Sequence, residues 1–255
     1  IACIHLKALP GAPNYKGSML EVIDAALTET EIFSRNGISA LIVETFRDNP
    51  FYPGSLPPET TAAMAVVVHE VKKAFPGPVG VNALRNDAQA ALAITLASKA
   101  DFIRVNVHTG AMLTDQGIIQ GKAHETLRTR KRLGLNTLIL ADARVKHASP
   151  LGTLSLEEEV NDAVERGLAD AIIVSGPATG AQVDPDELQR VNKCTSKPVL
   201  IGSGITPENL IILATQADGF IVGSYFKREG KAVNDVDETR VERMAQTYVR
   251  IINQA

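Results

Sequence analysis

Cysteine is scarce in this sequence, and no long hydrophobic run is present. The two cysteines, Cys3 and Cys194, argue against a disulfide framework in a chain of 255 residues, so we expect both to fill apolar positions in a reducing compartment such as the cytoplasm. The apolar stretch 88–97 is interrupted by Gln89 and Thr95, whereas about 20 apolar residues are needed to span a bilayer. We therefore expect no transmembrane segment.

The sequence also lacks any concentration of basic charge. Its 26 Lys and Arg residues are scattered and are outnumbered by 29 Asp and Glu residues, for a formal net charge of -3. Nucleic-acid-binding proteins need a basic patch or stripe for phosphate contacts, so nucleic acid is not an expected partner. The chain opens in a strand-like run without an initiator Met, which leaves open whether a targeting segment precedes it.

What is present fits one α/β domain, a (β/α)8 barrel over residues 1–255. A chain of this length fills one such barrel, and 45% hydrophobic with 22% charged residues is typical of a soluble globular domain. Short runs rich in Val, Ile and Leu alternate with helix-like stretches, a pattern typical of parallel strands covered by helices. We predict strands at 2–6, 40–44, 79–82, 102–105, 138–142, 171–175, 199–202 and 219–223.

Capping residues mark the ends of several predicted helices. Ser18 and Thr206 precede amphipathic stretches and are typical N-cap residues. Gly37, Gly134 and Gly167 each follow a helical stretch and precede a strand, so we predict that they adopt the left-handed conformation that ends many helices. These turns lie at the N-terminal face of the barrel, where residues usually serve stability.

Three connections on the C-terminal side of the strands are long, namely 7–17, 45–57 and 106–123. Long loops in a compact domain are often lids or binding loops, and the second of these contains three aromatic residues. We predict a lid over the barrel mouth. The alternative, in which these loops only cover the mouth or form a subunit contact, stays open.

Polar side chains follow the apolar runs where each strand ends. The C-terminal ends of parallel barrel strands meet at one face, so residues from different strands converge there. Burying so many ionisable groups without partners costs on the order of several kcal/mol each, which favours a functional site over a mere scaffold. The converging set is His5, Glu44, Asn82, Arg104, Asn106, His108, Asp142, Lys146, His147 and Ser175.

The last two predicted strands indicate an anion site. One ends in Gly202-Ser203-Gly204 just before a predicted helix, and the other ends in Gly223-Ser224. Glycine permits close backbone approach to an anion, and a helix start directs unpaired N–H groups toward it. Many barrels of this kind hold phosphate at this pair of loops. We predict that these five residues bind the phosphate of a small ligand.

Candidates for acid–base chemistry lie on the predicted strands or just after them. Glu44 and Asp142 emerge from strands on opposite sides of the barrel mouth and could flank a substrate. Crowding by Arg104 and partial burial would lower the pKa of Lys146 or His147, which would yield a general base or a Schiff-base amine. The alternative, in which Asp142 only pairs with Lys146 or Arg104, stays open.

No metal-binding motif stands out. The first strand contains no His-x-His pair, and no helix contains His-Glu-x-x-His. His5, Glu44 and Asp142 could assemble through the fold, but we predict no metal site, and the sequence identifies no cofactor.

Longer phrases carry a family resemblance. The sequence contains LPGAP, LIVETFRDNPF, GVNALRND, FIRVNVHTG, TDQGII, VKHA and IGSG, which together resemble the BtpA/SgcQ family from the first strand nearly to the C terminus. The resemblance implies a barrel similar to the ribulose-phosphate-binding group, and it adds Asp115 to the site. The phrase ETFRDN departs from the more usual ENFGD, which puts the loop contacts near Glu44 in doubt but keeps the carboxylate.

Two functions follow from these features. The first is an enzyme, a lyase, isomerase or hydrolase, that acts on a sugar phosphate or nucleotide derivative through Glu44, Asp142, Lys146, His147 and Arg104. The second, implied by the family name alone, is a non-catalytic factor for assembly of a photosystem I-type complex, peripheral to a membrane. Convergence of polar groups inside the mouth favours the enzyme. We also expect a homo-oligomer, because closed symmetric oligomers are common among soluble proteins.

Overall fold

The computed structural model describes residues 1–176 and 178–253. Its centre is a parallel eight-stranded sheet, which a parallel bridge between Ala2 and Val222 closes into a barrel. Each predicted run contains one strand, so the predicted (β/α)8 barrel is confirmed, although the last strand ends before Gly223. In sheet order the strands are β1 (Ala2–His5), β2 (Leu41–Glu44), β3 (Val79–Asn82), β4 (Phe102–Val105), β7 (Leu138–Ala143), β9 (Ala171–Val174), β10 (Val199–Ile201) and β11 (Gly219–Phe220).

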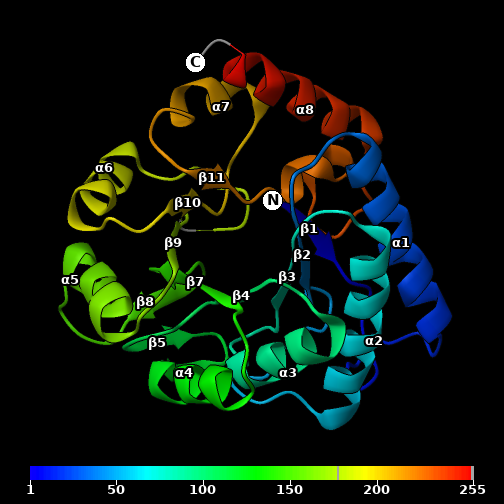
Figure 1. The fold of residues 1–255 in the computed structure, drawn as a ribbon, viewed down its shortest axis with the longest axis horizontal. Coiled ribbons are helices and arrows are strands. Elements are labelled where there is room, and N and C mark those ends of the chain that lie inside the picture. Colours follow the sequence, from blue (N-terminus) through cyan, green and yellow to red (C-terminus); the bar gives the residue numbers. More distant parts are fainter. Residues whose placement is uncertain (177, 254–255) are drawn as a thin grey trace.

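Helices surround the barrel, as Figure 1 shows, with the N terminus near its centre and the C terminus at its outer edge. Two short 3-10 helices, Ser224–Phe226 and Arg228–Gly230, precede the last α-helix. The α-helices are α1 (Met19–Arg35), α2 (Pro58–Ala74), α3 (Ala88–Ser98), α4 (Ala123–Arg132), α5 (Leu156–Asn161), α6 (Pro185–Cys194), α7 (Pro207–Leu213) and α8 (Glu238–Ile252), and a π-helical turn (Asp162–Arg166) continues α5.

Alternation along the strands divides the core into two layers. Successive side chains of a strand point to opposite faces, so Ile42 packs inside the barrel while its neighbour Val43 packs under the helices. The interior layer is apolar. Two residues further along, the interior-facing positions are polar, for example Glu44 above Ile42 and Arg104 above Phe102. The strand period therefore places a polar layer directly above an apolar plug.

Local signals behave as predicted at most helix ends. The Ser18 hydroxyl accepts a hydrogen bond from the backbone N–H of Glu21 at 3.2 Å, and Gly37 and Gly134 have φ of 71° and 65°. The prediction for Gly167 is wrong: its φ is -82°, and Leu168 takes the left-handed conformation. Glycine is needed there for space, because a Cβ atom at position 167 would lie 2.7 Å from the carbonyl oxygen of Ala163.

The loop 106–123 is more ordered than the sequence predicts. It contains the hairpin β5 (Ala111–Thr114) and β6 (Gly117–Gln120), and β5 also pairs with β8 (Ala148–Pro150). This small antiparallel sheet covers a third apolar cluster of Val107, Met112, Ile119 and Val145. The hairpin turn carries Asp115 to the barrel mouth, where Asp115 lines the main cavity.

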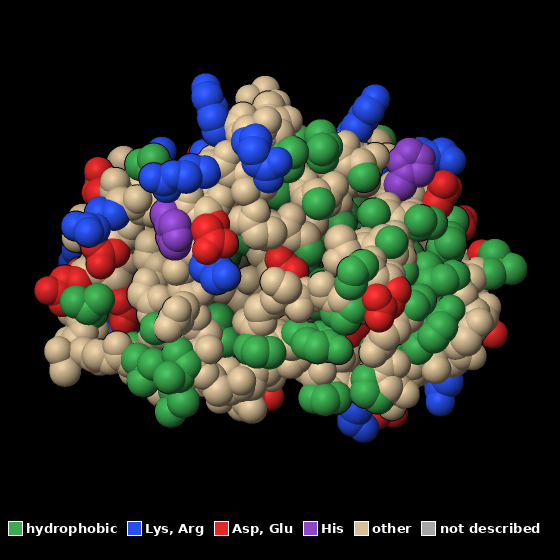
Figure 2. Space-filling view, turned by 90° about the horizontal axis from the view of Figure 1, so that it is seen from below, with side chains coloured by type: hydrophobic (Ala, Val, Ile, Leu, Met, Phe, Trp, Pro, Cys, Tyr) green, Lys and Arg blue, Asp and Glu red, His purple; other side chains and the backbone are tan. Residues whose placement is uncertain are grey.

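On the face drawn in Figure 2, most Lys and Arg side chains lie toward the upper and left parts, with acidic ones among them, and apolar side chains lie mainly toward the right and the bottom. Among the helices of the described residues, none combines the length and the apolar character needed to cross a membrane.

Candidate functional site

A cavity of about 550 Å³ lies at the C-terminal ends of the barrel strands. Strands β1 to β4 contribute His5, Glu44, Asn82 and Arg104 to its wall, one from each strand. The loops after β10 and β11 form another part of the wall. The predicted convergence of strand-end residues is therefore what the structure shows for these four side chains.

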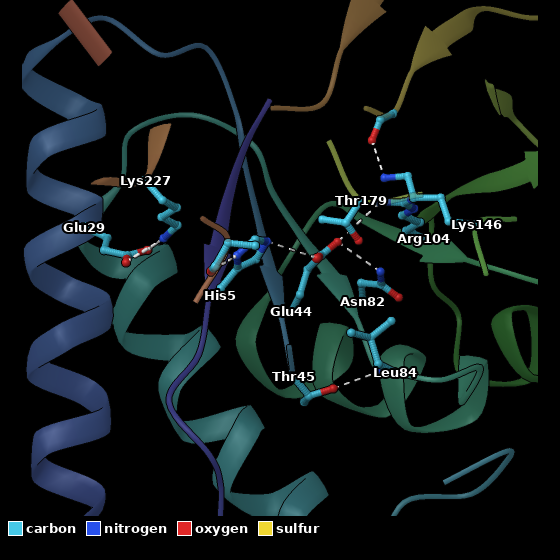
Figure 3. Close-up of polar contacts among 12 residues, drawn as sticks. His5, Glu29, Glu44, Thr45, Asn82, Leu84, Arg104, Lys146, Thr179 and Lys227 are labelled. Carbon is cyan, nitrogen blue, oxygen red and sulfur yellow. Dashed lines mark hydrogen bonds and ion pairs between the residues drawn. The ribbon is translucent and has the colours of Figure 1, made fainter. Parts of the chain in front are cut away.

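Glu44 lies at the centre of a buried polar network (Figure 3). Its Oε1 accepts hydrogen bonds from Asn82 Nδ2 at 3.0 Å and from Arg104 Nη1 at 3.4 Å, while its Oε2 lies 3.6 Å from His5 Nε2. Burial alone would raise the pKa of Glu44, but the positive charge of Arg104 and the hydrogen bond from Asn82 contribute to lowering it. Glu44 is therefore held as a carboxylate.

Asp142 pairs with Arg104, one of the two partners that the sequence suggests for it. Arg104 donates from Nε to Oδ2 at 3.1 Å and from Nη2 to Oδ1 at 2.9 Å, and Asn106 Nδ2 donates to Oδ2 at 2.6 Å. Burial disfavours the charged guanidinium, but Asp142 and Glu44 more than compensate and raise the pKa of Arg104. A bidentate pair with no exposed carboxylate surface fixes Arg104 in place.

His5 is fixed by contacts on two sides. Its Nδ1 lies 2.9 Å from the carbonyl oxygen of Ala232, and its ring stacks on Phe46 with the ring centroids 4.1 Å apart. Burial lowers the pKa of His5 to about 4, against the opposing influence of Glu44. The ring is therefore neutral at physiological pH, with Nε2 directed at the Glu44 carboxylate.

Lys146 brings an amine to the cavity wall. Its Nζ donates a hydrogen bond to the carbonyl oxygen of Gly202 at 2.7 Å. Burial, reinforced by the positive charge of Arg104, lowers the pKa of Lys146 to about 8. Roughly a tenth of the amines are then neutral at pH 7, many more than for an ordinary lysine. A neutral amine of this kind has a lone pair available to accept a proton or to attack a carbonyl.

The loop after β10 is shaped by close backbone contacts. The Ser203 hydroxyl accepts a hydrogen bond from the Gly176 N–H and donates one to the Ala181 carbonyl, both at 2.9 Å. Gly204 has a φ of 70°, and a Cβ atom there would lie 2.5 Å from the Ala181 carbonyl oxygen. The Ser203 side chain therefore holds the loop, and binding to a ligand would fall to the backbone.

Backbone donors from this loop and the next remain available. The N–H groups of Ser203, Gly204, Ser224 and Tyr225, here called the anion cup, donate to no acceptor within residues 1–176 and 178–253. All four residues line the cavity. Cups of backbone N–H groups at glycine-rich turns suit anions, because the partial charges of the donors add.

The other predicted residues divide into two groups. His147 and Asp115 line the cavity, and His147 Nε2 lies 3.1 Å from the Thr179 hydroxyl. Asp142 lies behind Arg104, and Ser175 is buried beside Gly202. His108 faces away from the cavity, since its Nε2 lies 2.8 Å from the Gly167 carbonyl oxygen.

The cavity residues that were not predicted include Cys3, Phe46 and Arg85. Cys3 precedes His5 by two positions, so the strand period alone could have placed it on the same face. Phe46 and Arg85 follow strand ends in loops, and Arg85 Nη2 donates to the Lys146 carbonyl oxygen at 2.6 Å. No periodic signal marks a loop residue, so sequence reasoning had no means to select these two.

Comparisons with known proteins agree with this fold. The chain is 44% identical to the photosystem I biogenesis protein BtpA of Synechocystis, over 94% of this chain and 84% of that protein. Among solved structures it resembles a thiamine phosphate pyrophosphorylase from Pyrococcus furiosus (TM-score 0.59, 16% identity, 89% of this chain and 90% of that one). It also resembles Mycobacterium tuberculosis tryptophan synthase (TM-score 0.60, 17% identity, 96% and 91%). Because the model described as the BtpA family matches residues 1–250, the chain belongs to the BtpA family.

Proposed function

We propose that this protein is an enzyme that acts on a small phosphorylated metabolite, a sugar phosphate or nucleotide derivative, inside the barrel mouth. One observation carries the proposal: phosphate-compatible backbone donors and an amine with a lowered pKa share a single cavity. Its volume of about 550 Å³ suits a small metabolite.

The residues divide between binding and chemistry. The anion cup binds the phosphate group through backbone N–H groups. Lys146 is placed to act as a general base or as an amine that attacks a carbonyl, because its pKa lies near neutral pH. Arg104 and Asn82 hold the Glu44 carboxylate in one position, and Asp142 holds Arg104. His147 and Asp115, which line the cavity, would contact the remainder of the substrate from the rim.

The reaction class that this arrangement favours is lyase or isomerase chemistry next to a carbonyl group. Lys146 is the group most suited to proton transfer, whereas both buried carboxylates are occupied by other side chains. The resemblance to a thiamine phosphate pyrophosphorylase adds support, because that name includes a phosphorylated compound.

A second candidate is a role in assembly of a photosystem I-type complex, with association at a membrane surface. The Synechocystis relative, named for photosystem I biogenesis, supports it. Such a role needs an exposed contact surface, and exposed apolar side chains on α7 and α8, namely Ile211, Ile212, Val249 and Ile252, would offer one to a partner or to a second copy. Nothing in an assembly role requires the polar network inside the mouth, which favours the enzyme.

A thermal-shift screen against sugar phosphates, nucleotides and inorganic phosphate tests the proposal. A ligand at one hundred times its dissociation constant stabilises the folded state by about 2.7 kcal/mol, so we expect Tm to rise by several degrees with the correct class. The variant Ser224→Asp places a negative charge in the anion cup and should abolish the rise. Substitution at Gly204 is less suitable, because its φ and its contact with Ala181 would strain the fold.

The matched control is Ser224→Asn, which keeps the size of the aspartate variant without its charge. We expect it to retain most of the Tm rise. Equal loss in both variants would show that the side chain, rather than its charge, disturbs the cup. No response of the parent protein to any phosphorylated compound would overturn the proposal and favour the assembly role.

A further inference from the structure

Three potential metal ligands meet in the wall of the cavity. The ligand atoms of Cys3, His5 and Glu44 all lie within 4.8 Å of one another, and all three residues are buried and line the cavity. The sequence suggests a different trio with Asp142, but that carboxylate is bound by Arg104 and Asn106. Cys3 takes its place because it precedes His5 by one strand period.

The orientation of His5 leaves two hydrogen-bond acceptors facing each other. A carbonyl oxygen only accepts, so the 2.9 Å contact with Ala232 requires a proton on His5 Nδ1. In the neutral ring Nε2 then presents a lone pair to Glu44 Oε2, 3.6 Å away. This contact is repulsive unless a cation lies between the two atoms or the ring takes a second proton. A cation bound between the two atoms, or a proton shared by them, would remove this repulsion.

The surroundings match those of a metal site. Metal-binding histidines usually donate their other N–H to a carbonyl or carboxylate, as His5 does to Ala232. Ligating carboxylates are themselves hydrogen-bonded, and Glu44 Oε1 accepts from Asn82 and Arg104 while Oε2 is directed at His5. Both of these hydrogen bonds go to Oε1, so Oε2 stays available to a metal ion.

Two of the cations near the cluster are paired with carboxylates of their own. Arg104 forms a bidentate pair with Asp142, and Lys227 Nζ binds both oxygens of Glu29 at 2.7 Å (Figure 3). These pairs reduce the repulsion that a metal dication bound to Glu44 would meet.

We propose that Cys3, His5 and Glu44 bind a transition-metal dication of the zinc class, with a fourth position open to the cavity. Tetrahedral zinc ligands lie roughly 3.3–3.7 Å apart, so the His5–Glu44 separation already fits, and the Cys3 sulfur must approach by about 1 Å at most. A thiolate and an imidazole select zinc-like metals over magnesium or calcium. A Cβ atom at Gly223 would lie 3.2 Å from His5 Nε2, so glycine leaves the space beside the cluster free.

The open position would give the metal a chemical use. A bound dication with three protein ligands and one free site polarises a carbonyl or phosphoryl oxygen as a Lewis acid. The proposal does not depend on the phosphorylated substrate, because the three ligands come from the protein alone.

Cobalt binding tests the site directly. Chelator-treated protein is titrated with Co²⁺, and a thiolate-to-cobalt charge-transfer band is followed by absorption spectroscopy while equilibrium dialysis gives the stoichiometry. We expect one Co²⁺ to bind per chain and to give a thiolate-to-cobalt band. Addition of Zn²⁺ should displace the Co²⁺ and remove the band. Cys3→Ser should lose the band, and Glu44→Gln should weaken Co²⁺ binding about tenfold or more while retaining the band at saturation.

Cys194→Ser is the matched control, because Cys194 lies at the end of α6, away from the cavity. It should retain the band and the stoichiometry. Circular dichroism and thermal unfolding show whether each variant folds. If Cys3→Ser does not fold, Co²⁺ binding by Glu44→Gln and by His5→Gln tests the site independently.

Two results would overturn the proposal. One is absence of stoichiometric Co²⁺ binding by the parent, or a band that Cys194→Ser removes. The other is a doubly protonated His5 ring in nitrogen NMR spectra of the metal-free protein at neutral pH that Zn²⁺ leaves unchanged, which would assign the positive charge to the ring. The phosphate screen is run with and without Zn²⁺, so failure of one proposal is distinguishable from failure of the other.

Discussion

The two halves of the barrel mouth hold polar groups in different ways. Strands β1 to β4 and β7 present side chains, and Glu44, Arg104 and Asp142 satisfy one another in a buried ionic network. Strands β10 and β11 are instead followed by loops that contain Gly202 and Gly223 and present backbone N–H groups. A buried charge must be paired within the protein, whereas a backbone N–H group at a cavity wall can stay unpaired until a ligand binds to it. The first half therefore determines the shape and the electrostatic field of the site, and the second half is available to bind a ligand.

Lys146 connects the two halves. Its amine is hydrogen-bonded to the Gly202 carbonyl of the binding half, and its pKa is lowered by burial and by Arg104 of the ionic half. A ligand held by the anion cup would therefore lie next to an amine whose basicity the opposite wall controls. The variants below disturb each half separately.

The largest effect should come from breaking the ionic half. Arg104→Met leaves Asp142 and Glu44 without their shared partner in a buried setting, and removing one member of such a network costs about 3–5 kcal/mol. We expect the free energy of unfolding, measured with urea, to fall by that amount.

Two controls define this loss. In Arg104→Met/Asp142→Asn the orphaned charge is removed as well, so part of the stability should return. Arg35→Met breaks an exposed pair with Glu238 and should leave the protein close to parental stability. A loss in Arg104→Met no larger than in Arg35→Met would show that the buried network contributes little.

An intermediate effect is expected from the pH dependence of Lys146. The folded pKa of about 8 lies below the ordinary value of 10.5, so the unfolded chain binds more protons between these values and stability rises with pH across that window. The difference corresponds to roughly 3 kcal/mol. Lys146→Met removes this titration, so its stability relative to the parent should fall by that amount between about pH 7 and pH 10.5.

Urea unfolding of parent and variant at matched pH values measures this difference, and groups that titrate in both proteins cancel. A difference that stays constant with pH would mean that the amine is not buried against a positive charge, and the case for Lys146 as a base would be lost.

Strand-end residues could be predicted because two simple regularities determine them. The period of two places every second residue inside the barrel, and the parallel order brings all strand ends to one face. His5, Glu44, Asn82 and Arg104 satisfy both conditions, and all four line the cavity. Gly202 and Gly223 could be predicted for a related reason, since a glycine just after a strand indicates that another group approaches the backbone closely.

The positions of residues beyond the strands do not follow these two regularities and could not be predicted from them. His108 lies only three positions after β4, yet the chain has already turned away, and its ring contacts the Gly167 carbonyl. Asp115 is brought back to the mouth by a hairpin that the apolar pattern of 106–123 did not predict. Pairing is also beyond reach of a single sequence: whether Asp142 meets Arg104 or Lys146 depends on rotamers that only the packed barrel determines.

The smallest effect should come from Ser175, at the border between the two halves. Its buried hydroxyl finds no hydrogen-bond partner among the described residues. Removing an unsatisfied buried group costs nothing beyond a small loss of packing, so Ser175→Ala should leave the unfolding free energy within about 0.5 kcal/mol or raise it. Thr45→Val is the contrasting variant, because the Thr45 hydroxyl accepts from the Leu84 N–H at 3.0 Å and its loss should cost about 1–3 kcal/mol (Figure 3). Equal losses in the two variants would show that the Ser175 hydroxyl has a partner in the free protein and belongs with the ionic half.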